Sequence, residues 1–157
     1  MDPMKNILYP TDFSEFSLAA LPYAITFARQ FDCRLHCLHV LDESYQYWLG
    51  AGENVIPAVV PTQEILQAAQ RQMTQFAEQH FKDLPIQLVA QVISGHPANS
   101  ILQYAQDFQI DLIVIATHGR SGLASVLLGS VTDKIVHKSP CPVLTVRHAG
   151  QQSPPVS

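Results

Sequence analysis

The feature that most constrains the fold is a set of short, nearly uncharged apolar runs that recur along the chain. The run DLIVIA at 111–116 is apolar after its aspartate and rich in β-branched residues. Such a run is typical of a strand buried on both faces of a parallel sheet. In chain order, strands are predicted over 5–10, 33–41, 85–93, 111–116 and 142–146.

The segments between these runs carry apolar residues at helical spacing. Helices are predicted, in chain order, over 14–31, 61–81, 97–108 and 130–139. Ser14 and Ser130 are the expected N-caps, and Asp133 would complete a near-capping box with Ser130. Pro22 lies inside the first helical pattern and should bend that helix.

Alternation of strands and helices predicts an α/β fold with right-handed crossovers. We expect a doubly wound five-stranded parallel sheet, order 3-2-1-4-5, with helices on both faces. Residues 1–147 form the expected domain, and 148–157 a flexible C-terminal tail. Residues 42–60 form a long loop whose aromatic group, Tyr45, Tyr47 and Trp48, could cover a ligand as part of a lid or pack against the sheet.

The composition narrows the class of protein. The 157 residues carry a net charge of −4 and only 14% charged side chains, which argues against a broad nucleic-acid surface. Three cysteines (Cys33, Cys37 and Cys141) form no CxxC pair, so a reducing cytoplasm fits best. No apolar run approaches the ~18 residues that cross a bilayer, so no membrane partner is expected.

Three of the seven glycines fall within eleven residues, at 119, 122 and 129. In a doubly wound sheet the ligand lies past the carboxyl ends of the strands, where the winding direction reverses. The residues predicted to face that crevice are Pro10, Thr11, Asp12, Ala116, Thr117, His118 and Gly119. Small residues followed by a helix N-terminus suit an anion such as phosphate. Alternatively, Gly119 and Gly129 only turn the chain and Ser130 only caps the helix.

The run THGRSGLASVLLGS at 117–130, with Asp12 after the first strand and the final SPCPVLTV, resembles the universal stress protein family. The similarity extends from Lys5 to about Arg147. Nucleotide-binding members of that family carry the pattern G-x2-G-x9-G-[S/T]. This chain has Ala116, Gly119, Gly129 and Ser130 at those four places, so three of the four match.

The resemblance implies a protein that binds ATP, with Mg²⁺ accompanying the phosphates. Asp12 would meet the ribose or adenine, and Val40 would supply backbone contacts to adenine. The phosphates would be surrounded by Gly119, Arg120, Gly129, Ser130, Val131 and Thr132. Ala116 is the departure: it weakens binding if the family glycine needs a positive φ, and is tolerated if only small size matters. The resemblance also implies a homodimer joined along the last strand, 142–146.

Other roles compete for several of these residues. Asp12 could cap the turn of the DFSE segment, and Arg120 could face solvent. Thr132 fits the first turn of a helix better than a metal site. His118 could act as an acid or base, or could only line its turn, and the sequence pairs no nucleophile with it.

A zinc site at Cys33, His36, Cys37 and His39 is disfavoured, because alternation along a strand points His36 away from the other three. The function preferred from the family resemblance is a nucleotide-binding module in a stress response, acting through conformation or partner choice. The alternatives are a dimeric interaction module without nucleotide and a slow ATP hydrolase. The absence of GxxxxGK[ST] excludes the commonest other ATP site.

Overall fold

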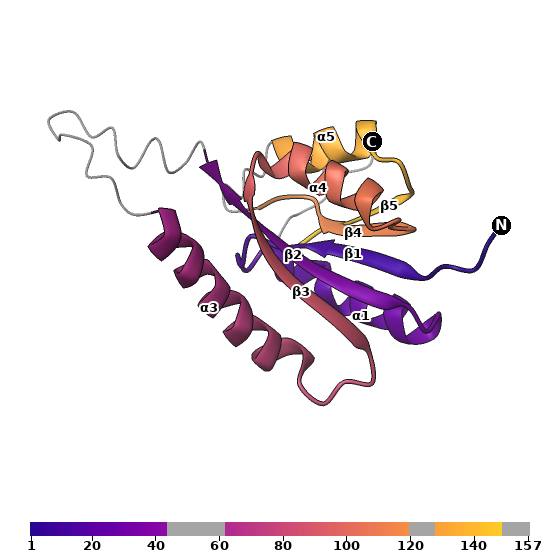
Figure 1. The fold of residues 1–157 in the computed structure, drawn as a ribbon. Coiled ribbons are helices and arrows are strands. Elements are labelled where there is room, and N and C mark those ends of the chain that lie inside the picture. The colour runs from indigo at the N-terminus through magenta and orange to yellow at the C-terminus, as the bar shows by residue number, and fades with distance from the viewer. Residues whose placement is uncertain (44–61, 120–127, 149–157) are drawn as a thin grey trace, which may run out of the picture.

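The structure, a computed structural model of the 157-residue chain, describes residues 1–43, 62–119 and 128–148. Five parallel strands form one sheet in the order β3-β2-β1-β4-β5 (Figure 1). The strands are β1 (Asn6–Pro10), β2 (Arg34–Asp42), β3 (Gln87–Gly95), β4 (Leu112–Ala116) and β5 (Val143–Val146). The predicted order is confirmed. Two strands extend further than predicted: β2 runs through Asp42, and β3 continues to Gly95.

Helices cover both faces of the sheet, as predicted (Figure 1). They are the short 3₁₀ helix η1 (Ser17–Ala19), α1 (Leu21–Gln30), α3 (Thr62–Phe81), α4 (Pro97–Asp107) and α5 (Ser130–Lys138). Helices α1 and α3 pack against one face through Leu21, Met73 and Phe76. Helices α4 and α5 pack against the other through Ile101 and Ile135.

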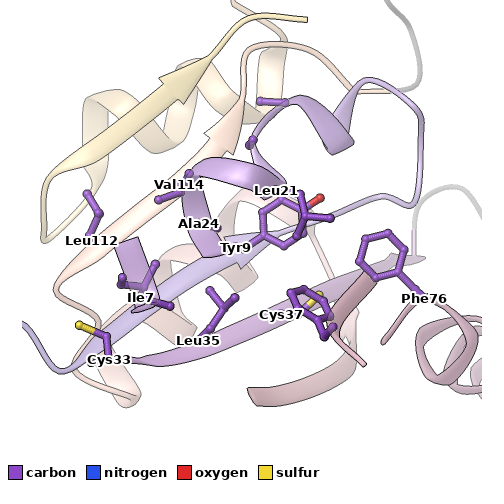
Figure 2. Close-up of a cluster of buried hydrophobic side chains, with 14 of the residues drawn as sticks. Ile7, Tyr9, Leu21, Ala24, Cys33, Leu35, Cys37, Phe76, Leu112 and Val114 are labelled. Carbon is purple, nitrogen blue, oxygen red and sulfur yellow. The ribbon is translucent and has the colours of Figure 1, made fainter. Parts of the chain in front are cut away.

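Side chains that alternate along the strands divide the core into two clusters. Figure 2 shows the cluster under α1 and α3, where Tyr9 of β1 and Cys37 of β2 lie beside Phe76 of α3. The Tyr9 hydroxyl donates a hydrogen bond to the carbonyl of Ser17 at 2.9 Å. Burial raises the pKa of Tyr9 above its usual value and that of Cys37 to about 12, so both stay protonated. This cluster fixes the chain that follows β1.

The first helix begins later than predicted. Helix α1 starts at Leu21, so Pro22 falls in its first turn, where a missing N–H costs no helical hydrogen bond, and the predicted bend is wrong. Ser14 does not cap α1, whose N-cap is Ala20. The hydroxyl oxygen of Ser14 instead accepts the N–H of Ser17, the first residue of η1, at 3.2 Å.

The expected alternation along β2 is confirmed. Cys33 and Cys37 lie in the cluster of α1 and α3, whereas His36 lies on the other face and contacts Tyr104 through its Nδ1 at 2.8 Å. The described helices include none long and apolar enough to cross a membrane. The predicted loop from residue 44 onward, with its three aromatic residues, and the tail from residue 149 lie outside the described residues.

Candidate functional site

The carboxyl ends of β1 and β4 separate at the point where the sheet reverses its winding direction. Pairing of β1 with β2 continues to Pro10 and Leu38, but pairing of β1 with β4 ends at Leu8 and Ile113. Thr11 donates its N–H to Leu38, so the neighbouring residue of β1, Pro10, faces β4. Proline has no N–H to donate. The ladder between β1 and β4 therefore lacks a hydrogen bond where the predicted crevice opens.

A tight turn follows β1 and holds Asp12 at this crevice. The Asp12 Oδ1 atom accepts the N–H of Ser14 at 2.9 Å, and the Thr11 hydroxyl oxygen accepts the N–H of Phe13 at 3.0 Å. Asp12 therefore caps the turn, as one of the two sequence interpretations proposed. Its other carboxylate oxygen lies against Gly119: a Cβ atom placed on Gly119 would be 2.5 Å from Asp12 Oδ2. The structure thus brings together two of the predicted site residues, Asp12 and Gly119.

Gly129 packs against the same segment from the other side. Its N–H donates to the carbonyl of Thr117 at 2.7 Å, and a Cβ atom on Gly129 would lie 3.3 Å from that oxygen and 3.6 Å from the Cα of His118. The contact with the Thr117 oxygen would be tighter than Cβ atoms normally make, so a side chain here would require the backbone to shift by a few tenths of an ångström. Glycine thus suits this close approach, and its φ of −63° shows that no left-handed conformation is involved.

Gly129, and not Ser130, is the N-cap of helix α5. The prediction of Ser130 as N-cap was wrong: the helix already begins at Ser130, and the residue before it packs closely on the Thr117 carbonyl. Ser130 is the first helical residue, and Asp133 donates its N–H to the Gly129 carbonyl at 2.8 Å instead of completing a capping box. The first-turn N–H groups, those of Ser130, Val131 and Thr132, have no acceptor within the helix and point along its axis toward the crevice.

Thr132 ties this helix end to β4. Its hydroxyl donates to the carbonyl of Ala116 at 2.8 Å, and the side chain is buried. This agrees with a role in the first turn of the helix. Ala116 itself ends β4 without a positive φ, and it is buried in the core cluster of α1 and α3. Alanine thus replaces the family glycine at a position where the backbone has no positive φ and the methyl group packs in the core.

Val40 lies on β2 beyond the end of β1. Because Leu38 receives the hydrogen bond of Thr11, alternation directs the backbone N–H and C=O of Val40 to the same side, past the last residue of β1. Its side chain is buried on the α4 and α5 face. The neighbouring His39 points the other way, and its Nδ1 lies 2.8 Å from the carbonyl oxygen of Thr11. A carbonyl can only accept, so Nδ1 carries the proton.

Two residues at this site were missed by sequence reasoning, His39 and Phe13. Their rings pack together with centroids 4.3 Å apart. The D-x-S spacing of 12–14 is a signal for the Asp12 turn, but no pattern in the sequence points to a bulky residue inside it.

The remaining predicted residues are less central or lie outside the described chain. His118 is buried beside the turn, with its Nδ1 3.1 Å from the Thr117 hydroxyl. Arg120 lies outside the described residues. Within 1–43, 62–119 and 128–148, no three His, Cys, Asp or Glu side chains are grouped to hold a metal ion. The arrangement as a whole brings a carboxylate, two glycines and a helix N-terminus together beyond the ends of β1 and β4.

Comparison with known proteins agrees with this geometry. The sequence model of the Universal stress protein family matches residues 3–147. The universal stress protein MJ0531 of Methanocaldococcus jannaschii is 34% identical over 143 residues, which are 91% of this chain and 82% of that protein. The universal stress protein MJ0577 of the same organism is 31% identical over 154 residues, 91% of this chain and 94% of that protein. Its solved structure superimposes with a TM-score of 0.79, covering 95% of this chain and 99% of that chain.

More distant members share the fold and were solved with nucleotides. A universal stress protein in complex with cAMP is 22% identical, with a TM-score of 0.60 over 93% of this chain and 98% of that one. A universal stress protein family protein of Arabidopsis thaliana with AMP bound is 16% identical, with a TM-score of 0.62 over 96% and 95%. The family match and the two archaeal relatives span the same strands and helices that build the crevice. The chain belongs to the universal stress protein family.

Proposed function

We propose that this chain binds an adenine nucleotide, ATP in the first place, in the crevice between β1 and β4, and serves as a binding and signalling module in a stress response. One observation carries the proposal: Asp12 Oδ2 lies against Gly119, while Gly129 brings the N-terminus of α5 against the same backbone. Nucleotides bound to two distant members of the family support the choice of ligand.

The phosphates would lie at the N-terminus of α5. Peptide dipoles and unpaired N–H groups favour an anion there. The contacts would come from the first-turn residues Ser130, Val131 and Thr132, with Arg120 from the adjoining segment. Because the Thr132 hydroxyl proton already goes to Ala116, Thr132 would contribute its N–H.

The nucleoside would lie over the end of β1, beside Pro10 and Thr11. Asp12 Oδ2 can accept hydrogen bonds from ribose hydroxyls while Oδ1 stays bonded to Ser14. The backbone of Val40, directed past the end of β1, offers one donor and one acceptor to the adenine edge.

Magnesium would enter with the nucleotide. Mg²⁺ keeps several waters and binds phosphate oxygens in preference to all-protein cages. The nearest carboxylate on α5, that of Asp133, is more than half exposed and lies 3.6 Å from His137 Nδ1. The residues present thus fit a metal held by the phosphates rather than by the protein.

We propose that the nucleotide is held without turnover at an enzyme's ordinary rate. Phosphoryl transfer requires a positioned nucleophile and cations that neutralise the transferring group. His118 is buried with its Nδ1 beside Thr117, and Lys134 donates to Asn99 of α4 at 2.6 Å. Release of γ-phosphate from saturating Mg-ATP should therefore stay far below the ~10 per second typical of enzymes. Fast release that His118→Ala abolishes would favour the hydrolase instead.

Mass analysis of small molecules released from freshly purified protein tests the ligand directly. We expect an adenine nucleotide at up to one equivalent, and titration of the emptied protein with ATP and GTP then tests the base. Protein that releases no nucleotide and binds neither would favour the interaction-only module.

We further propose a cytoplasmic homodimer joined along β5. Residues 143–146 are half-buried and form one edge of the sheet, and an unpaired edge is prone to strand addition. All three cysteines are free thiols, which fits a reducing compartment. In this proposal 1–147 act as one domain, and 148–157 take no part in the site.

A further inference from the structure

We propose that Phe13 is a positioning residue for Asp12, and that it links the crevice to helix α3 through the ring of Phe76. The inference rests on the proposed nucleotide site and names a device that controls it. It is carried by the backbone of Phe13, the rings around it, and the hydrogen bonds of the turn on either side.

The backbone of Phe13 is strained. Its φ of +63° lies in the left-handed region, where bulky side chains are genuine outliers. Glycine and asparagine adopt this conformation readily, but phenylalanine does not. Contacts with the surrounding residues must therefore stabilise it.

Side chains from two other elements provide that hold. The Phe13 ring lies 4.3 Å from the His39 ring of β2 and 5.5 Å from the Phe76 ring of α3, measured between centroids. Thr11 accepts the Phe13 N–H on its hydroxyl oxygen, and its carbonyl oxygen accepts a hydrogen bond from His39 Nδ1. The Phe13 ring is therefore held between β2 and α3, and the backbone before it is held by β2.

The left-handed step sets the direction of Asp12. It turns the chain so that the N–H of Ser14 reaches back to Asp12 Oδ1 at 2.9 Å. With Oδ1 fixed, Oδ2 is left against Gly119, at the place proposed for the ribose. A Phe13 ring that lost its support would release this turn and the carboxylate with it.

The contact between the Phe13 and Phe76 rings connects helix α3 to the turn that holds Asp12. Phe76 is 8% exposed and also stacks on Tyr9 of β1, with centroids 6.5 Å apart. A shift of α3 would thus be felt at Asp12. By linkage, a nucleotide that fixes Asp12 also stabilises the docking of α3.

Phe76→Leu tests this coupling, and Phe81→Leu is its matched control. Both residues lie on α3 in the same core cluster, but Phe81 packs on Phe76 and not on Phe13. Calorimetry on the folded variants should show Phe76→Leu weakening ATP binding about tenfold, the loss expected for one hydrogen bond to a charged group. Phe81→Leu should lower the melting temperature and leave the Kd unchanged. Equal affinity in the two variants would overturn the coupling.

Substitutions at Phe13 distinguish the effect of its ring from the effect of its backbone conformation. Phe13→Asn tolerates the left-handed backbone but removes the ring, so it should weaken binding about as much as Phe76→Leu. Phe13→Tyr keeps the ring and should restore wild-type affinity. Full affinity in Phe13→Asn would overturn the positioning role.

Amide hydrogen exchange of Ser14 provides a readout without nucleotide. Phe13→Asn and Phe76→Leu should speed its exchange, whereas Phe81→Leu should not. If wild type binds no nucleotide, the proposed function fails, and Ser14 protection still decides whether Phe13 holds the turn. If wild type binds and no variant changes either the Kd or the exchange, only this inference fails.

Discussion

Gly119 and Gly129 act by lacking a Cβ atom, and this is the residue-scale basis of the site. At Gly119 the free space is taken by the Asp12 carboxylate, and at Gly129 by the backbone of Thr117 and His118. Neither glycine requires a positive φ. The demand is for close approach, which is what a phosphate-binding backbone also requires.

Gly119→Ala should therefore weaken ATP binding. Its methyl group would meet Asp12 Oδ2 and displace the carboxylate. Affinity should therefore fall by about 10- to 100-fold, which corresponds to one charged hydrogen bond of about 1.5–3 kcal/mol. Calorimetry gives the affinity, and thermal unfolding shows whether the variant is folded. Unchanged affinity would exclude the placement of Asp12 at the ligand.

Ala116→Gly is the matched control for that variant. It restores the family glycine but removes a buried methyl group from regular strand, so it should cost about 0.5–1 kcal/mol of stability. Nucleotide affinity should stay the same, because Ala116 faces the core cluster.

Part of the candidate site could be predicted residue by residue from the sequence. Asp12 and the two glycines could be predicted from their places after strands and before a helix. Ser130 could not be rejected as N-cap, because glycine and serine both favour that position. The left-handed Phe13 has no signal in the sequence, since its conformation is imposed by tertiary contacts with His39 and Phe76.

Among the elements, the N-terminus of α5 is the one that the proposed function uses most. Its place depends on the buried hydrogen bond from Thr132 to Ala116. Thr132→Val should lower the free energy of unfolding by about 1–3 kcal/mol, because it leaves the buried carbonyl of Ala116 without its hydrogen bond. Unfolding in urea measures this free energy.

Thr74→Val on α3 is the control for Thr132. Thr74 also donates to a backbone carbonyl, that of Gln70 at 3.0 Å, but at the surface. Thr74→Val should change the free energy of unfolding by no more than about 0.5 kcal/mol. A Thr132→Val variant as stable as Thr74→Val would show that α5 is anchored elsewhere.

The packing of α4 on β2 makes stability depend on pH. Burial, with a smaller effect of Arg34, lowers the pKa of His36 below its usual 6.5. The folded state therefore holds His36 neutral, and the unfolded state binds the extra proton. This part of the stability is present above pH 6.5 and is lost as the pH falls through the lowered pKa.

Unfolding by urea at pH 7.5, 6.5 and 5.5 checks this dependence. The free energy of unfolding should fall toward pH 5.5, and His36→Gln should flatten part of that fall. Burial also lowers the pKa of His80, which should account for a remainder in the same direction. An unaltered slope in His36→Gln would contradict the assignment.

Element types were predictable where the pattern was long and periodic. Helix α3 follows from its apolar spacing, and α4 begins at Pro97, as expected for proline in a first turn. The start of α1 was not predictable, since the apolar spacing continues through the 3₁₀ turn of 17–19. Pro22 marks where the true helix begins.

For the whole molecule, the sheet order followed from the alternation of buried strands and helices. The crossover rule and the apolar character of β4 place β1 and β4 at the centre, and the crevice with them. The oligomeric state could not be predicted in the same way. The crossover rule describes one chain, and an edge strand such as β5 forms an interface only when a second copy binds to it.

Thr145→Pro tests the proposed dimer with little damage to the sheet. Ile113 and Thr117 donate to the carbonyls of Pro142 and Val146, so alternation points the N–H of Thr145 outward. Proline removes that donor without breaking the ladder to β4. Sedimentation should give a dimer for wild type and a monomer for the variant. A wild-type mass of one chain at tens of micromolar concentration, or a dimer that survives the substitution, would exclude this edge.

Calorimetric titration of nucleotide-free protein with Mg-ATP, run in parallel on wild type and Gly129→Val, tests whether ATP binds at the N-terminus of α5. Wild type should bind ATP at one site per chain. The folded variant should lose binding, because the added side chain would begin 3.3 Å from the Thr117 carbonyl and push the N-terminus of α5 away from that backbone. No heat at millimolar Mg-ATP, or a folded Gly129→Val that binds as well as wild type, would contradict binding at this site.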